Sequence, residues 1–182
     1  MIRTILIFGA IGALIVGAFM VAGSLTWAGG GQAPPENGVV VGYLTQLVAL
    51  TVVFLGIKHH RDVARGGVIK FFPALGVGIG ISAVATLGWV IGWEIVLAMS
   101  NMDFPAMMKE QMLAQAQARG APEAELQKIS AEAASFGEMY GNPLIRMPIS
   151  FTEMFPVGVL VSLISAGLLR NSRFMPARQA AP

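Results

Sequence analysis

The chain has 182 residues, of which 55% are hydrophobic and only 12% are charged, and its formal net charge is +2. Soluble domains carry about 25% charged residues, so this composition excludes an ordinary soluble domain, and the small net charge gives no reason to expect a nucleic-acid partner. The absence of cysteine excludes disulfides, thiolate metal ligands and cysteine nucleophiles.

Four apolar stretches are long enough to cross a membrane as helices, since a hydrocarbon core of roughly 30 Å needs about 20 residues at about 1.5 Å each. They lack the alternation of barrel strands and are too long for them. In chain order they are residues 4–23, 38–57, 71–99 and 149–169. The first is longer than the apolar core of a cleaved signal peptide, so we expect it to remain. We predict an all-α integral membrane bundle of four transmembrane helices, with residues 1–182 forming a single membrane domain.

Charged residues are distributed unequally between the segments outside these spans. Eight basic residues and one acid fall on one side, whereas seven acids and four basic residues fall on the other. Basic residues near span ends stay in the cytoplasm, so we expect a multi-pass membrane protein with both termini cytoplasmic. An even number of spans independently requires the termini to share a side.

Small residues recur at four-residue steps in three of the predicted spans. In the first span these are Gly9, Ala13 and Gly17. The third span has Gly76 with Gly80 and Gly88 with Gly92, and the fourth has Gly158, Ser162 and Ala166. Such stripes let helices approach closely in lipid, where hydrophobicity supplies no drive between them. They favour packing within the bundle over a dimerisation face.

Two groups of residues are of types that can bind metal ions: a pair of histidines and a cluster of methionines. His59 and His60 are adjacent, so on a helix they point about 100° apart and are poorly placed to chelate one metal. Five methionines leave Cu(I) binding open as an alternative, although methionine is also a flexible apolar filler. These are Met99, Met102, Met107, Met108 and Met112. No cysteine or histidine accompanies them, and we expect no metal and no cofactor.

Residues 104–140 predict an extracytoplasmic helical hairpin between the third and fourth spans. Gly120 and Pro122 separate its two helices, and each helix has apolar residues at three- and four-residue steps. A hairpin this small needs support from the bundle, a lipid surface or another protein. We therefore expect membrane lipids as partners, together with a homo-oligomer or a protein partner that binds through the hairpin.

Glu94 and Glu153 are the only acids within the predicted spans, where ionisable groups are costly and indicate function by default. Counting about 1.5 Å per residue places both near the outer surface, with Glu153 roughly one turn deeper. Arg146 is close enough in sequence to pair with either acid. These three residues form a candidate polar membrane site, beside an aromatic belt of Trp89 and Trp93 at the membrane interface.

A structural explanation of the same residues is also open. Ser150 and Glu153 fit a capping box at the start of the fourth span, in which the serine holds a free amide and the glutamate reaches back to the helix start. In that case Glu94 lies in the interface and Arg146 satisfies one of the two acids.

Several segments occur in a characteristic order and spacing: Gly56-Ile-Lys-His-His-Arg-Asp62, Gly92-Trp-Glu-Ile95, Asn142-Pro-Leu-Ile-Arg-Met147 and Phe151-Thr-Glu-Met-Phe-Pro-Val-Gly158. Together they resemble the bacterial membrane family catalogued as domain of unknown function 4199, over most of the chain. The resemblance implies a four-helix, multi-pass protein of the bacterial inner membrane. The family brings no established activity, so it implies no functional residues.

The residues show no serine-histidine-acid set, no phosphate-binding loop and no metal constellation. The leading interpretation is a non-enzymatic scaffold, accessory subunit or envelope factor that acts through the outer hairpin. The alternative is a small oligomeric transporter, or an ion- or lipid-binding protein, that uses a polar site at Glu94 and Glu153. A membrane enzyme acting on lipid comes third, because only these two glutamates could serve as a nucleophile or general base.

Overall fold

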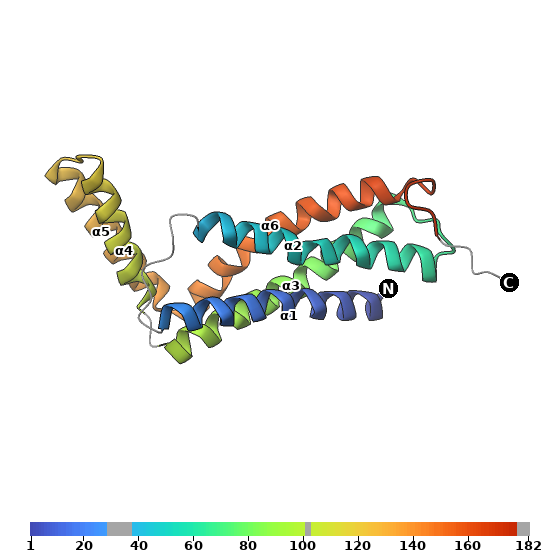
Figure 1. The fold of residues 1–182 in the computed structure, drawn as a ribbon, viewed down its shortest axis with the longest axis horizontal. Coiled ribbons are helices and arrows are strands. Elements are labelled where there is room, and N and C mark those ends of the chain that lie inside the picture. The colour runs from blue at the N-terminus through green and yellow to red at the C-terminus, as the bar shows by residue number, and fades with distance from the viewer. Residues whose placement is uncertain (29–37, 101–102, 178–182) are drawn as a thin grey trace.

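A computed structural model describes residues 1–28, 38–100 and 103–177. Within these ranges the regular elements are all helical, and no strand occurs. They are α1 (Ile2–Ala28), α2 (Gly38–His59), the π-helical turn η1 (His60–Ala64), α3 (Phe71–Ser100), α4 (Phe104–Ala118), α5 (Glu123–Tyr140) and α6 (Pro143–Leu169). The predicted all-α class is confirmed. Figure 1 shows α1, α2, α3 and α6 running lengthwise in one bundle, with α4 and α5 together at one end; we call these two helices the helical arm.

Among the described residues, three helices are long and apolar enough to cross a membrane. They are Ile2–Gly23 within α1, Phe71–Met99 within α3, and Pro143–Leu169, which is α6. They correspond to the first, third and fourth predicted spans. The second predicted span coincides with α2, which packs along α1 and α6.

The start of α6 differs from the prediction, because the helix begins at Pro143 instead of residue 149. Asn142 caps it, with its side-chain oxygen accepting a hydrogen bond from the Leu144 N–H at 3.0 Å. Proline is well suited to the first helical position, where its missing N–H costs nothing. Ser150 and Glu153 therefore lie well inside the helix, and the predicted capping box is wrong.

Local sequence also sets the ends of the arm helices. The Asp103 carboxylate accepts a hydrogen bond from the Ala106 N–H at 3.0 Å and so caps α4. Gly120 ends α4 with a φ of 74°, a left-handed conformation that glycine adopts without a steric penalty. Pro122 follows in an extended conformation and precedes α5. The break between α4 and α5 therefore lies at Gly120 and Pro122, where the sequence predicts it.

The small-residue stripes lie where α3 packs against α1 and α6. A Cβ atom on Gly88 would lie 2.2 Å from the Ala13 Cβ and 2.8 Å from the Ala13 Cα. At the contact with α6, a Cβ on Gly158 would lie 2.7 Å from the Ser82 Cβ. The Ser82 hydroxyl also donates to the Gly158 carbonyl oxygen at 3.1 Å. Gly88 and Gly158 therefore pack within the bundle, whereas nothing lies within 4 Å of the Cβ position of Gly17.

We expect Gly88→Ala to lower the free energy of unfolding by about 1–3 kcal/mol, the range for overpacking a tight contact. The added methyl group must displace the α1 backbone at Ala13. Gly76→Ala on the same helix is the matched control, because nothing lies within 4 Å of its Cβ position. Thermal unfolding of both variants in one detergent measures the difference. Equal melting temperatures would contradict the close approach of α1 and α3.

Candidate functional site

An aromatic cluster joins the helical arm to the end of α3. The Trp93 indole N–H donates to the Tyr140 hydroxyl oxygen at 2.6 Å. The Phe104 ring stands edge-on to Trp93 with centroids 5.1 Å apart, and Phe136 lies 5.1 Å from Tyr140. We call these four residues the aromatic junction. Burial raises the pKa of the Tyr140 hydroxyl, so this group stays protonated and neutral within the junction.

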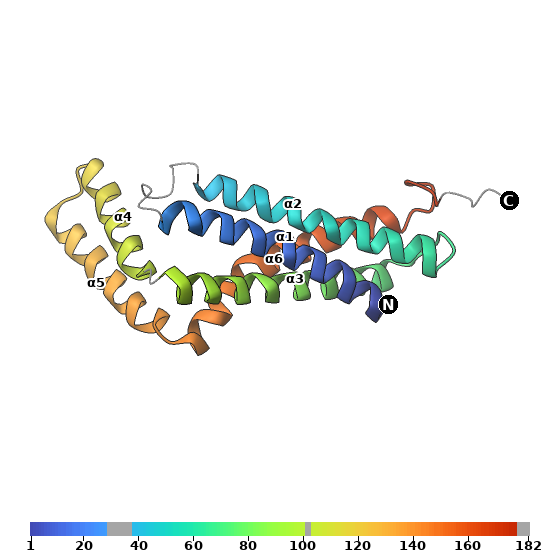
Figure 2. The same ribbon diagram turned by 60° about the horizontal axis from the view of Figure 1, so that its bottom comes forward.

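Arg146 connects three helices beside the aromatic junction. Its Nε donates to Glu94 Oε1 at 2.8 Å and its Nη2 donates to Glu94 Oε2. The two side chains therefore form a bidentate ion pair, with Glu94 near the end of α3. Its Nη1 donates to the Tyr140 carbonyl oxygen at 3.2 Å, at the end of α5. The two charged side chains are only 15% and 19% exposed. Figure 2 shows the end of α3 and the start of α6 meeting the arm in this region.

Glu153 lies outside this ion pair. It is on α6, about two turns beyond Arg146. Glu94 and Arg146 line a hollow of about 660 Å³ between α3 and the arm. Glu153 lines a different hollow of about 180 Å³, which we call the aromatic pocket. Phe104 and Tyr140 line both hollows. The structure thus brings Glu94 and Arg146 together and places Glu153, the third predicted site residue, in a different hollow.

The two predicted belt residues have different surroundings. Trp93 is engaged by Tyr140, as described above, and both tryptophans pack against the apolar core of the bundle. Trp89 lines the aromatic pocket with Glu153. The placement of these rings at a membrane interface stays a prediction.

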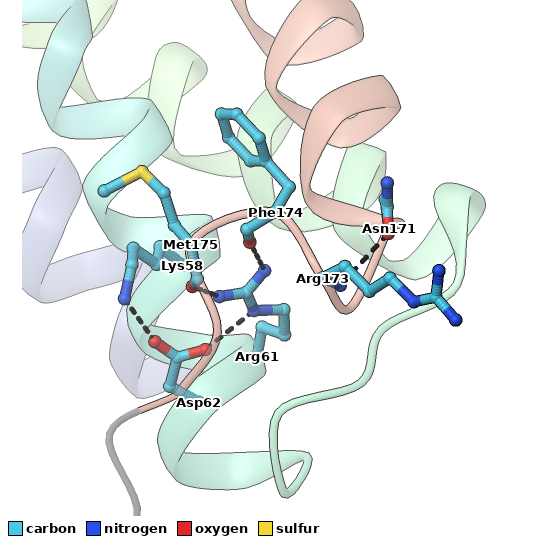
Figure 3. Close-up of polar contacts among 7 residues, drawn as sticks. All are labelled: Lys58, Arg61, Asp62, Asn171, Arg173, Phe174 and Met175. Atoms are coloured by element: carbon cyan, nitrogen blue, oxygen red, sulfur yellow. Dashed lines mark hydrogen bonds and ion pairs between the residues drawn. The ribbon is translucent and has the colours of Figure 1, made fainter.

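A second polar cluster lies at the opposite end of the bundle, around Arg61, which is one of the eight basic residues predicted on the cytoplasmic side. The Arg61 side chain is fully buried and donates to the carbonyl oxygens of Phe174 at 2.9 Å and Met175 at 2.5 Å. Its Nε donates to Asp62 at 2.7 Å, and Lys58 donates to the other Asp62 oxygen at 2.5 Å. Figure 3 shows this arrangement, which we call the Arg61 clasp. One signal in the sequence could have indicated this cluster. Asp62 is the single acid among the charged residues predicted on that side.

The two adjacent histidines near the clasp face different neighbours. His59 packs its ring against Phe8 with centroids 5.3 Å apart, whereas the His60 Nδ1 lies 3.5 Å from the Thr4 hydroxyl. Burial lowers the pKa of His60, which keeps its ring neutral. Among the residues that the structure describes, no group of three or more histidine, cysteine, aspartate or glutamate side chains could hold a metal ion. Of the predicted methionine cluster, Met102 lies outside the described residues.

A family model described as "Protein of unknown function (DUF4199)" matches residues 4–171. The chain belongs to this family. The match runs from the first turn of α1 to just beyond α6, so the DUF4199 unit includes the bundle and the helical arm. No curated protein and no solved structure matches the chain. The roles of its residues must therefore be argued from their geometry.

In this DUF4199 protein, the Arg61 clasp predicts a dependence of stability on pH. Burial opposes ionisation of Asp62, but hydrogen bonds from Arg61 and Lys58 outweigh it and hold the pKa of Asp62 below its usual value. A carboxylate whose pKa is lowered by folding adds stability above its ordinary pKa of about 4, and this contribution is lost as the pH falls through the folded-state pKa.

We therefore expect the melting temperature of the unchanged protein to exceed that of Asp62→Asn at neutral pH. The difference should shrink as the pH falls below about 4, because protonation then removes the same charge that the substitution removes. Melting curves of both proteins in one detergent, from neutral pH downward, measure it. A difference that stays constant over this range would contradict the role of the Asp62 charge.

Proposed function

We propose that this chain is a non-enzymatic membrane protein that serves as a scaffold, accessory subunit or envelope factor through its helical arm. The observation that carries this is the attachment of the arm. The aromatic junction holds it to α3, and Arg146 ties the end of α5 to α3 and α6. A segment that only connects two spans needs no contacts that hold its orientation. The arm instead presents a defined polar surface, which includes the exposed residues Gln111, Gln115, Lys128 and Glu132.

We further propose four spans in the bacterial inner membrane, with α2 as the additional span and residues 1–182 as one membrane domain. The 22 residues of α2 reach about 33 Å, enough for the hydrocarbon core. The Arg61 clasp joins the end of α2 to the segment after α6 at the end of the bundle opposite the arm. Basic residues concentrate there, which favours a cytoplasmic position for this end and an extracytoplasmic one for the arm.

Single cysteines test this topology, because the chain has none of its own. If α2 spans the membrane, Gln32→Cys and Arg65→Cys lie on opposite sides. We expect a membrane-impermeant maleimide to label Gln32→Cys and Ser130→Cys in intact cells, and Arg65→Cys only after lysis. Labelling of Gln32→Cys and Arg65→Cys under the same condition would overturn the fourth span.

Site-specific photocrosslinking tests the scaffold role. A photoreactive residue at Gln111 or Glu132 should give a protein adduct of defined mass, formed either with a second copy of the chain or with another protein. Leu163, which is exposed on α6, is the matched control and should give lipid adducts only. The proposal fails if the arm positions yield no protein adduct, or if Leu163 yields the same one.

An oligomeric transporter, or an ion- or lipid-binding protein acting through Glu94 and Glu153, is the second candidate. The surroundings of Glu153 favour this second candidate, because no ion pair among the described residues includes this acid. Against it, Glu94 is engaged by Arg146 and lines a different hollow from Glu153. Flux into proteoliposomes that is abolished by both Glu94→Gln and Glu153→Gln would promote this candidate over the scaffold.

A further inference from the structure

The aromatic pocket has features that a scaffold role does not require. Its volume of about 180 Å³ corresponds to about six water molecules, which is room for one small organic group. Helices α3, α4, α5 and α6 all contribute to its walls. Five rings and one carboxylate line it: Trp89, Trp93, Phe104, Phe136, Tyr140 and Glu153.

Glu153 has no cationic partner in the described part of the chain. Arg146 is the only basic residue within α6, and its donors are directed at Glu94 and at the Tyr140 carbonyl oxygen. The buried Trp89 Nε1–H lies within reach of the Glu153 carboxylate, but an indole is a neutral donor and supplies no counter-charge. A carboxylate within a membrane-spanning helix is costly unless a counter-charge or a proton neutralises it.

The composition of the pocket selects among ligand classes. Aromatic rings alone would suit any apolar group, but a neutral guest would leave the carboxylate uncompensated. Calcium and magnesium ions require several oxygen ligands, and among the described residues that line the pocket Glu153 supplies the one carboxylate. Alkylammonium ions satisfy both features, because their positive charge is attracted to the faces of aromatic rings and pairs with a carboxylate.

We propose that the aromatic pocket binds a small alkylammonium group, with Glu153 as its counter-ion and the five rings as its walls. A free organic amine and the headgroup of an amine-bearing phospholipid present the same cation, so both are sources of this ligand. The site is independent of the scaffold role, since it is complete whether or not the arm binds a protein.

Choline binding to the purified full-length protein in detergent tests the proposal. Saturable changes in tryptophan fluorescence and in melting temperature are expected, since two tryptophans line the pocket. The uncharged carbon isostere of choline, in which a carbon replaces the nitrogen, should bind at least about tenfold more weakly, because it loses both the ion pair and the attraction to the rings.

Two variants separate the carboxylate from the rings. Glu153→Gln, which keeps the shape of the side chain, should weaken choline binding at least about tenfold, and Trp89→Leu should weaken it about threefold to tenfold. Glu138→Gln, on an exposed residue of α5, is the control and should bind choline normally. Melting temperatures without ligand show which variants are folded. If Glu153→Gln does not fold, the proposal is tested by choline binding to Trp89→Leu and by comparison of choline with its isostere.

Nanodiscs of defined lipid distinguish the two sources. If a phospholipid headgroup is the resident ligand, phosphatidylethanolamine nanodiscs should weaken choline binding relative to phosphatidylglycerol nanodiscs. Equal choline affinity in the two lipids assigns the pocket to a free amine. The proposal is overturned if folded protein shows no saturable choline binding in detergent, if the isostere binds as tightly as choline, or if Glu153→Gln binds choline normally.

Discussion

Arg61→Ala is expected to lower the free energy of unfolding by about 2–4 kcal/mol. The substitution leaves the carbonyl oxygens of Phe174 and Met175 without their donor and leaves Asp62 with Lys58 alone. It also removes a large side chain from a fully buried position. We expect the segment after α6 to separate from the bundle, which limited proteolysis near Phe174 would detect before global unfolding.

Two further variants make the Arg61 result specific. Arg65→Ala removes an exposed basic residue close in sequence and should change stability by no more than about 0.5 kcal/mol. Arg61→Lys keeps the charge but loses the planar fork that reaches two carbonyl oxygens and Asp62, so it should remain well below the unchanged protein. If Arg61→Ala melts at the same temperature as Arg65→Ala, the clasp does not stabilise the fold.

Breaking the ion pair of Arg146 with Glu94 should have a similar effect, with each of Glu94→Gln and Arg146→Gln costing about 2–4 kcal/mol. Either substitution leaves the remaining charge largely buried, since the two side chains are only 19% and 15% exposed. Loss of Arg146 also frees the Tyr140 carbonyl oxygen at the end of α5. We expect faster hydrogen exchange in α4 and α5, because this contact helps to hold the arm against the bundle.

A double-mutant cycle tests whether the two residues act as a unit. The combined Glu94→Gln and Arg146→Gln variant should be destabilised by less than the sum of its parts, by at least about 1 kcal/mol. The exposed ion pair between Arg119 and Glu125, whose side chains are 62% and 42% exposed, supplies the control, and breaking it should cost no more than about 1 kcal/mol. Additive effects at Glu94 and Arg146 would contradict their coupling.

The same variants connect stability with the proposed function. If the arm must be held in place to bind its partner, photocrosslinks from Gln111 and Glu132 should weaken when Glu94 or Arg146 is replaced. Replacement of Arg119 should leave these crosslinks intact, because that ion pair joins parts of the arm to each other. The comparison separates a requirement for arm position from a general loss of surface charge.

The helical elements could be predicted largely from local patterns. The third predicted span, residues 71–99, matches α3 (Phe71–Ser100) closely, because one apolar run begins directly after Lys70. Gly120 and Pro122 likewise marked the break between the arm helices. The start of α6 was missed although its signal was present. Apolar length does not include Asn142 and Pro143, which begin the helix ahead of the apolar run.

The sequence by itself determined that the chain is helical and apolar enough for a membrane, and where most helices begin and end, because run length, caps and glycine breaks act within a few residues. Only the tertiary structure decided the long-range partners of Arg146 and Arg61. Arg146 lies 52 residues from Glu94, and Arg61 lies 113 residues from Phe174. The first pairing depends on how α3, α5 and α6 pack, and the second on how the end of α2 meets the segment after α6. The same packing places Glu153 among aromatic rings, with no cationic partner among the described residues. No local pattern contains that geometry, because it arises from side chains that the fold brings together from distant segments.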